Sequence, residues 1–343
     1  MELSARKLAV LEAIVRAYIE TGEPVGSKIL TSLMENAPSS ATLRNEMSEL
    51  CDLGYLEQPH ISAGRIPTGN AYRLFVNSLM MPTEINDSTK NYIDSFLAER
   101  KFDPESILSS VADILYRLTG LTAFGYTVTD GDVTVKQIEL LGISRHSVIV
   151  FLITSDGSSK SRVCRISEPL SDELTQKLKD IFDKRIKRKP LMALNKAYLQ
   201  NIIAFAGFDS FELMPLLTSI FDMVAEAAES RINIAGEKGI YNVLGEEKAT
   251  RVISLISRCE PLVTACESYE GSTEVIFGDD TPFNDLKGTA MVVCKYNILN
   301  KYRGRIGIIG SDRMSYEQIV SGVEYIASRL SEIMTEVQKD MED

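Results

Sequence analysis

The stretch from Pro38 to Leu79 constrains this chain more than any other part of it. Its pattern predicts a short amphipathic helix ending near Gly54, then a strand, a tight Ser-Ala-Gly-Arg turn and a further helix. A helix with one polar face, followed at once by a β-hairpin, is how a winged helix-turn-helix meets duplex DNA. A DNA-binding regulator is therefore the leading interpretation.

Two helices are expected before this stretch. The first carries an apolar stripe from Leu8 to Ile19 at helical spacing and ends near Gly22. The second follows a turn and is capped by Ser27. Its inward-facing residues are expected to be Ile29, Leu30 and Leu33.

The third helix is the strongest candidate for DNA contact. Leu43, Met47 and Leu50 share its apolar side, and the other side carries hydroxyl, amide and guanidinium groups. Arginine pairs well with guanine and asparagine with adenine in the major groove. An ordinary solvated helix face and a plain surface hairpin are the alternatives. The residues predicted to contact DNA are Lys28, Ser39, Ser40, Thr42, Arg44, Asn45, Ser48, His60 and Arg65, with Gly64 permitting a positive φ in the hairpin turn.

The charge balance points the other way. The chain has a formal net charge of −11, and residues 1–80 hold seven Lys/Arg against nine Asp/Glu. Non-specific attraction to phosphates should be weak, so specific binding would depend on a few well-placed cations.

Beyond residue 80 the pattern predicts an α+β fold. Strand-like segments are expected at 121–128, 133–141, 147–154 and 161–166, then helices from 171 to 231, then strands again. Asp130-Gly131-Asp132 predicts a hairpin between the first two strands. We expect an N-terminal domain at 1–80, a discontinuous domain at 81–166 and 240–343, and a mainly helical insertion at 167–239.

Two further segments have plain structural interpretations. The basic run 183–189 is interpreted as a solvated helix end in preference to a DNA contact. The glycines of Gly304–Gly310 lack phosphate-loop spacing, so a strand packed on the final helix is expected. Arg313 and Tyr316 are candidates for contacts between domains or subunits, or for a buried structural role.

The sequence contains no recognisable motif for a catalytic, metal-binding or cofactor-binding site. The five cysteines are widely spaced without a CxxC pair, and there are only two histidines. We expect no enzyme activity, no metal, no cofactor and no disulfide framework. The charged amphipathic start and the lack of a long apolar run predict a cytoplasmic protein without a membrane partner.

Five segments resemble the HrcA family, the heat-inducible transcription repressors of bacteria. They are VGSKIL (Val25–Leu30), SSATLRNEM (Ser39–Met47), LGYLEQPHISAGRIPT (Leu53–Thr68), AYRLFV (Ala71–Val76) and GRIGIIGSDRMSYEQIVSGVEYIASRL (Gly304–Leu330). Together they bracket nearly the full chain.

The resemblance implies a winged helix domain joined to a GAF-like domain that carries a dimerising insertion. It also implies a homodimer on an inverted-repeat operator upstream of chaperone genes, with the active state promoted by the chaperonin GroEL and lost on heat stress. Two other classes stay open: a GAF-like sensor whose small-molecule ligand controls DNA affinity, and an acidic scaffold whose N-terminal domain binds protein. A deep pocket with convergent polar groups would favour the sensor.

Overall fold

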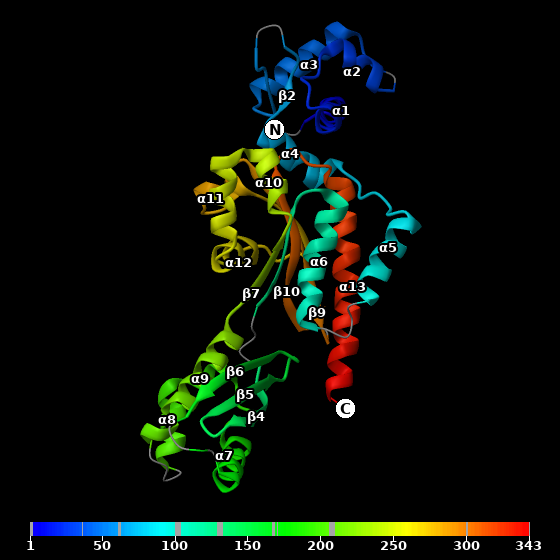
Figure 1. The fold of residues 1–343 in the computed structure, drawn as a ribbon. Helices are drawn as coiled ribbons and strands as arrows, with labels where there is room; N and C mark the ends of the chain where they lie inside the picture. The colour runs from blue at the N-terminus through cyan, green and yellow to red at the C-terminus, as the bar shows by residue number, and fades with distance from the viewer. Residues whose placement is uncertain are drawn as a thin grey trace.

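The computed structural model describes residues 3–35, 37–60, 63–99, 104–128, 133–166, 169, 171–205, 210–299 and 301–342. The chain folds into three parts arranged end to end, an N-terminal unit, a central body and a third unit at the far end (Figure 1). Helices and strands are both abundant, so the α+β class expected from the sequence is confirmed.

The N-terminal unit is three helices, a small hairpin and a closing helix. Its elements are α1 (Ala5–Thr21), α2 (Ser27–Leu33), α3 (Ser40–Asp52), β1 (Leu56–Glu57), β2 (Ile66–Pro67), α4 (Gly69–Leu74) and a π-helical turn (Phe75–Leu79). Serine side chains cap α1 and α3, because Ser4 and Ser39 each accept from the amide three residues later.

The core of this unit corrects one prediction. Leu30 is fully buried, but Ile29 is 53% and Leu33 is 52% exposed, so the expected inward face of α2 was wrong for two of its three residues. With seven residues, α2 presents only Ser27 and Leu30 to the core. Ile29 is turned about 100° from Leu30, and Leu33 is the last residue of the helix.

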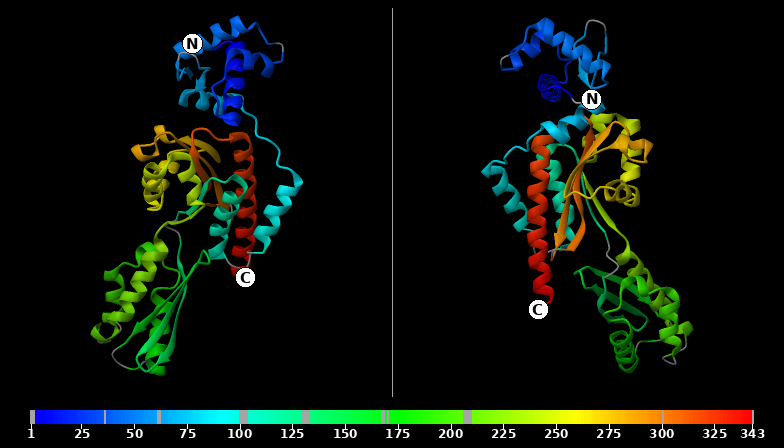
Figure 2. Two further views of the ribbon diagram at one scale, coloured as in Figure 1. Left: turned by 45° about the horizontal axis from the view of Figure 1, so that its top comes forward. Right: turned by 180° about the vertical axis from the view of Figure 1, so that it is seen from behind.

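The central body is built on a five-stranded sheet in the order β7-β3-β10-β9-β8, with every neighbouring pair antiparallel. Helices α6 and α13 lie against one face, with α5 outside them, and α10, α11 and α12 cover the other (Figure 2). The bounds are α5 Asp87–Ala98, α6 Pro104–Thr119, β3 Thr122–Thr127, β7 Arg231–Ala235, α10 Glu237–Leu244, α11 Glu246–Ile256, α12 Glu260–Glu267, β8 Thr273–Phe277, β9 Thr289–Ile298, β10 Lys301–Ser311 and α13 Tyr316–Glu342.

Strand β10 holds the body together. Ile306 and Ile308 belong to the core on the α6 and α13 side, and Ile309 belongs to the core beneath α10–α12. The glycine-rich segment Gly304–Gly310 is therefore a central strand followed by the final helix, as the sequence predicted.

The third unit combines a three-stranded sheet with helices. Its elements are β4 (Val135–Ser144), β5 (Ser147–Thr154), β6 (Ser159–Arg165), α7 (Asp172–Arg185), a 3₁₀ turn (Leu191–Ala193), α8 (Lys196–Phe205) and α9 (Ser210–Ala228). One face of the sheet packs on these helices, where residues such as Val150 and Leu216 share a core.

The predicted hairpin between the first two strands was wrong. Strand β3 pairs with β7 and β10 in the body, whereas β4 pairs with β5 in the separate sheet. A turn motif in the sequence predicts that the chain bends there. It does not determine with which strand the next strand pairs. Asp130, Gly131 and Asp132 themselves lie outside the described residues.

The third unit also bears on the expected insertion. Strands β4–β6, assigned from the sequence to the body, share their core with α7 and α9, and β7 joins the sheet of the body instead. We therefore propose insertion borders near Val133 and Ala228 in place of 167 and 239.

Candidate nucleic-acid interface

The outer face of α3 carries the side chains expected to read bases. Arg44, Asn45 and Ser48 are exposed, while Leu43 and Met47 on the opposite side are buried. Helix α3 lies in the N-terminal unit, at the end of the molecule opposite the third unit (Figure 1). This leaves a polar, convex surface available to a large ligand.

The hydroxyls at the start of α3 already have partners. The Ser39 side chain accepts from the amide of Thr42 at 3.2 Å and lies 3.0 Å from the Thr42 hydroxyl. Ser40 Oγ is 2.9 Å from Ser27 Oγ, which ties α2 to α3. These groups fix the geometry of the two helices, and Lys28 is exposed beside them on α2.

The hairpin is fastened to the turn before α2. The backbone N–H groups of Val25 and Arg65 each donate to the other residue's carbonyl at 2.9 Å. A Cβ on Gly64 would lie 2.5 Å from the backbone of Val25, so glycine is needed here for close approach; the structure records no positive φ at this residue.

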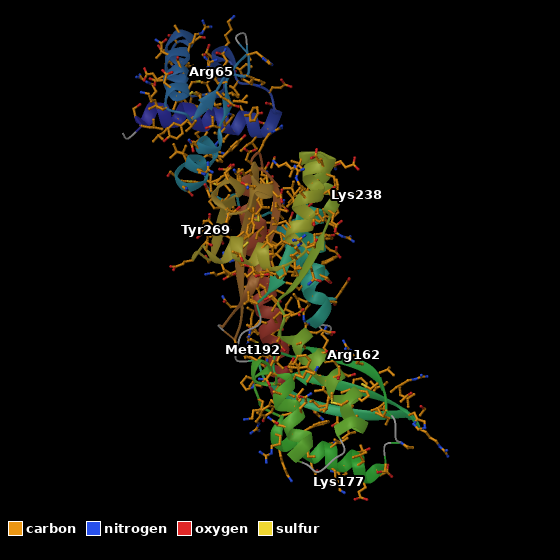
Figure 3. The ribbon with its side chains drawn as sticks, turned by 90° about the vertical axis from the view of Figure 1, so that its left-hand side faces the viewer. Arg65, Arg162, Lys177, Met192, Lys238 and Tyr269 are labelled. Atoms are coloured by element: carbon orange, nitrogen blue, oxygen red, sulfur yellow. The ribbon has the colours of Figure 1, made fainter. Side chains whose placement is uncertain are left out.

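Arg65 and His60 flank the tip of this hairpin. Arg65 lies in the N-terminal unit (Figure 3). It is half-buried, and its Nε has no hydrogen-bond partner among the described residues. His60 is exposed. Ile61 and Ser62 lie outside the described residues, so the predicted turn is only partly seen.

Glu46 ties α3 to α1 through ion pairs, a role that the sequence reasoning missed. It is 6% exposed on α3, accepts from Arg6 Nε at 2.7 Å, and lies 3.6 Å from Lys7 Nζ. Lys7 also pairs with Glu49 at 2.8 Å, and this hydrogen bond raises the Lys7 pKa. The carboxylate's place between Leu43 and Met47 was the available signal, because it puts Glu46 on the buried side.

Ion pairs join the N-terminal unit to the body. Arg16 on α1 makes two bonds to the Glu317 carboxylate, at 2.5 and 2.9 Å, and the Met81 amide donates to the same group at 3.1 Å. Arg73 on α4 makes a similar double contact with Asp280 at 2.9 Å. Bidentate contacts of this kind fix direction as well as distance.

Arg313 and Tyr316 complete this junction. Arg313 donates to the Ile19 carbonyl near the end of α1 and stacks over the Tyr18 ring at 5.5 Å. Tyr316 is buried, with its ring centroid 6.3 Å from that of Tyr72. Both residues thus make the contacts between domains that the sequence raised as one of their possible roles.

The two buried tyrosines differ in hydrogen bonding. The Tyr316 hydroxyl donates to the Asp312 carbonyl at 2.5 Å, whereas the Tyr72 hydroxyl has no partner among the described residues. Burial raises the pKa of both phenols, so each stays protonated at neutral pH.

The basic run contributes little to this end of the molecule. Lys184 and Arg185 lie in the last turn of α7, and Lys187 pairs with Asp183 at 3.8 Å. These positions belong to the third unit, opposite α3 (Figure 1). The structure thus agrees with the interpretation as a solvated helix end.

Comparison with known proteins identifies the family of this chain. The family model for the C-terminal domain of HrcA protein matches residues 105–320. The chain belongs to the HrcA family. It is 31% identical to the heat-inducible transcription repressor HrcA of Lachnoclostridium phytofermentans, over 97% of this chain and 98% of that one. The HrcA of Brevibacillus brevis is 27% identical over 97% and 98%.

A solved structure shares the fold. A crystal structure described as that of a hypothetical protein has a TM-score of 0.69 and 25% identity, covering 98% of this chain and 99% of that one. Membership of a family of transcription repressors makes this chain a regulator and not an enzyme.

Two other kinds of feature are absent from the described residues. No cluster of three or more His, Cys, Asp or Glu there is placed to hold a metal ion. Within the same part of the chain, no helix is both long and apolar enough to cross a membrane. The five cysteines are all free thiols, four of them buried.

The orphan hydroxyl of Tyr72 gives a testable pair of variants. Tyr72→Phe should raise the free energy of unfolding, because a buried unpaired hydroxyl costs about 1–3 kcal/mol. Tyr316→Phe, the matched change across the junction, should lower it by about 1 kcal/mol because it loses a made hydrogen bond. Urea unfolding of both variants measures the difference, and equal effects would contradict this assignment.

Proposed function

We propose that this protein represses heat-shock transcription by binding an inverted-repeat operator of chaperone and chaperonin genes. The observation that carries the proposal is the exposed polar face of α3, with Arg44 and Asn45 beside a hairpin anchored at Val25. The N-terminal unit then acts as a winged helix-turn-helix, and the body as a GAF-like domain. As a bacterial repressor it works in the cytoplasm.

The nine predicted DNA contacts divide into two groups. Thr42, Arg44, Asn45 and Ser48 would reach base edges from the outer face of α3, since a recognition helix reads the major groove with its exposed side. Lys28, Ser39, Ser40, His60 and Arg65 would contact the phosphate backbone and fix the register. The capping role of Ser39 is compatible with this, because its hydroxyl can accept from Thr42 and donate to a phosphate.

A homodimer matches two recognition helices to two operator half-sites. The third unit offers a surface suited to this. Leu141, Ile149 and Val163 lie in one row across β4, β5 and β6 on the sheet face turned away from α7–α9, and Leu141 is 55% and Val163 63% exposed. Phe151 and Ile143 extend the exposed apolar area. A second copy of this face would cover it.

Control by temperature and by GroEL completes the proposal. The junction that holds α1 and α4 on the body rests on a few ion pairs and one aromatic cluster. Folded proteins are stable by only about 5–15 kcal/mol, so modest heating can release such a regulator. GroEL would return the released chain to the binding-competent state.

Arg44→Ala tests the assignment of α3. It should weaken operator affinity by about 1–3 kcal/mol and relax specificity at one position, because a bidentate guanine contact is lost. Arg251→Ala is the control, since Arg251 is an exposed arginine on α11 in the body. Fluorescence anisotropy with an inverted-repeat duplex and a scrambled duplex, at two salt concentrations, measures both. Unchanged affinity in a folded Arg44→Ala protein would contradict the assignment.

Val163→Asp tests the dimer face. A charge at this highly exposed position of the apolar row should leave the protein monomeric, because its desolvation would oppose burial against a second copy. Val243→Asp provides the control at an exposed apolar residue of α10 in the body. Light scattering after size exclusion gives the mass. A dimer that persists in Val163→Asp but not in Val243→Asp would move the interface to the body.

Heat release is tested by following melting and operator binding together. Circular dichroism and anisotropy should give the same midpoint temperature, and added GroEL should restore binding after cooling. Binding that survives well above the melting midpoint would show that heat does not act through unfolding.

A further inference from the structure

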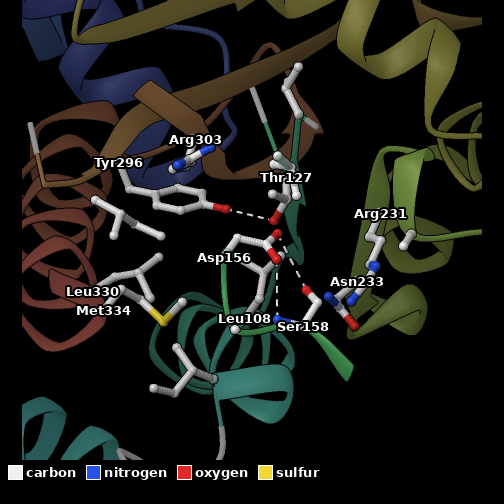
Figure 4. A pocket seen from close by; sticks show the side chains of 16 residues that line it. Leu108, Thr127, Asp156, Ser158, Arg231, Asn233, Tyr296, Arg303, Leu330 and Met334 are labelled. Carbon is white, nitrogen blue, oxygen red and sulfur yellow. Dashed lines mark hydrogen bonds between the residues drawn. The ribbon is translucent and has the colours of Figure 1, made fainter. Parts of the chain in front are cut away.

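A cavity of about 90 Å³ lies where the third unit joins the body (Figure 4). Its walls include the end of β3 and the start of β7, the two strands at which the chain leaves the body and returns. Helices α6 and α13, strands β9 and β10 and the turn between β5 and β6 also line it. A group bound here would touch both units at once.

The strands bring polar side chains to this cavity in register. Arg231 of β7 is the pairing partner of Thr127 of β3, whose hydroxyl is 2.7 Å from that of Tyr296 on β9. The ladder between β9 and β10 is irregular between Tyr302 and Gly304, which makes Arg303 the extra residue of a bulge. A bulge re-aims the side chain it carries, and Arg303 lines the cavity.

Arg231 is the cation best placed to receive a ligand. It is half-buried, and among the described residues its guanidinium has no hydrogen-bond or ion-pair partner. Asn233, two residues along β7 on the same face, lines the cavity beside it (Figure 4). A guanidinium beside an amide is suited to a carboxylate.

Asp156 supplies the opposite charge. Its Oδ1 accepts from the Thr154 hydroxyl at 2.5 Å and from the Ser158 amide at 3.2 Å, which fix the carboxylate in place. Its Oδ2 has only a long contact of 3.4 Å with the Ser158 hydroxyl. Gln338 of α13 holds the same turn by donating to the Ser155 carbonyl at 2.6 Å.

The rest of the wall is apolar. Leu108 from α6 and Leu330 and Met334 from α13 line it. One water-sized group takes up about 10–15 Å³ of a cavity measured in this way. The cavity of about 90 Å³ therefore has room for roughly six to nine non-hydrogen atoms. Charges of both signs with an apolar wall exclude a simple hydrocarbon, and Asp156 offers a contact that a simple anion would leave unused.

We propose that this cavity binds a small aliphatic α-amino acid. The ligand carboxylate would pair with Arg231, with Arg303 and Asn233 beside it; the ammonium would donate to Asp156; and the aliphatic side chain would lie against Leu330 and Met334. A bound amino acid then bridges the third unit and the body.

Isothermal titration of the full-length protein with L-valine tests the proposal, using isovalerate, which lacks the ammonium group, and L-valinamide, which lacks the carboxylate charge, as probes that also fit the cavity. L-valine should bind, and each probe should bind at least about tenfold more weakly because one charged contact is lost. Arg231→Gln should weaken L-valine binding about as much. Arg145→Gln, at an exposed arginine in the turn after β4, is the control and should leave it unchanged.

Three results would overturn the proposal: no heat of binding with L-valine, L-leucine or L-alanine at millimolar concentration, equal binding of valinamide, or full affinity in Arg231→Gln. Circular dichroism confirms that each variant is folded, and Asn233→Ala gives a second, smaller perturbation of the same wall. No DNA is present in these titrations, so their outcome is independent of operator binding.

Discussion

The packing of Tyr316 between the N-terminal unit and the body is the contact on which the rest of the structure depends. Its ring lies 6.3 Å from Tyr72 and 6.2 Å from Phe277, so a single aromatic cluster joins α4, α13 and the end of β8. The apolar residues of α1 and α3 and those of α13 therefore form one continuous core. Arg16, Arg73 and Arg313 surround that cluster and set the direction in which α3 is presented.

This arrangement is compatible with the DNA-binding surface proposed for an acidic protein. Four of the seven cations in residues 1–80 are paired with carboxylates of the protein itself, namely Arg6, Lys7, Arg16 and Arg73. Lys28 and Arg44 remain exposed on α2 and α3. Few available cations imply weak non-specific binding, so discrimination would come from base contacts and from the symmetry of a dimer.

The candidate site was predictable in part. The caps, the apolar spacing of Leu43, Met47 and Leu50, and the hairpin residues identified the helix and its outer face, since helical periodicity is a local property. Glu46 was missed because a carboxylate is expected to be exposed at the surface. Its partners Arg6 and Lys7 lie some forty residues away in the sequence and are known only from the structure. Gly64 was assigned to turn flexibility, but its role is the close approach of Val25.

The sequence by itself determined many of the helices and strands, the elements of the N-terminal unit and the family, because these follow from local spacing and from continuous segments of side chains. It did not predict β7 or the helices α10, α11 and α12. Only the tertiary structure decided which strands pair. β3 and β4 follow each other in the chain yet belong to different sheets, and β7 returns to the first after an excursion of about a hundred residues. Which strands pair depends on the burial of whole sheet faces. That contribution to the free energy comes from residues far apart in the sequence. The same choice brings Arg231 and Asp156 to one cavity, which no local pattern encodes.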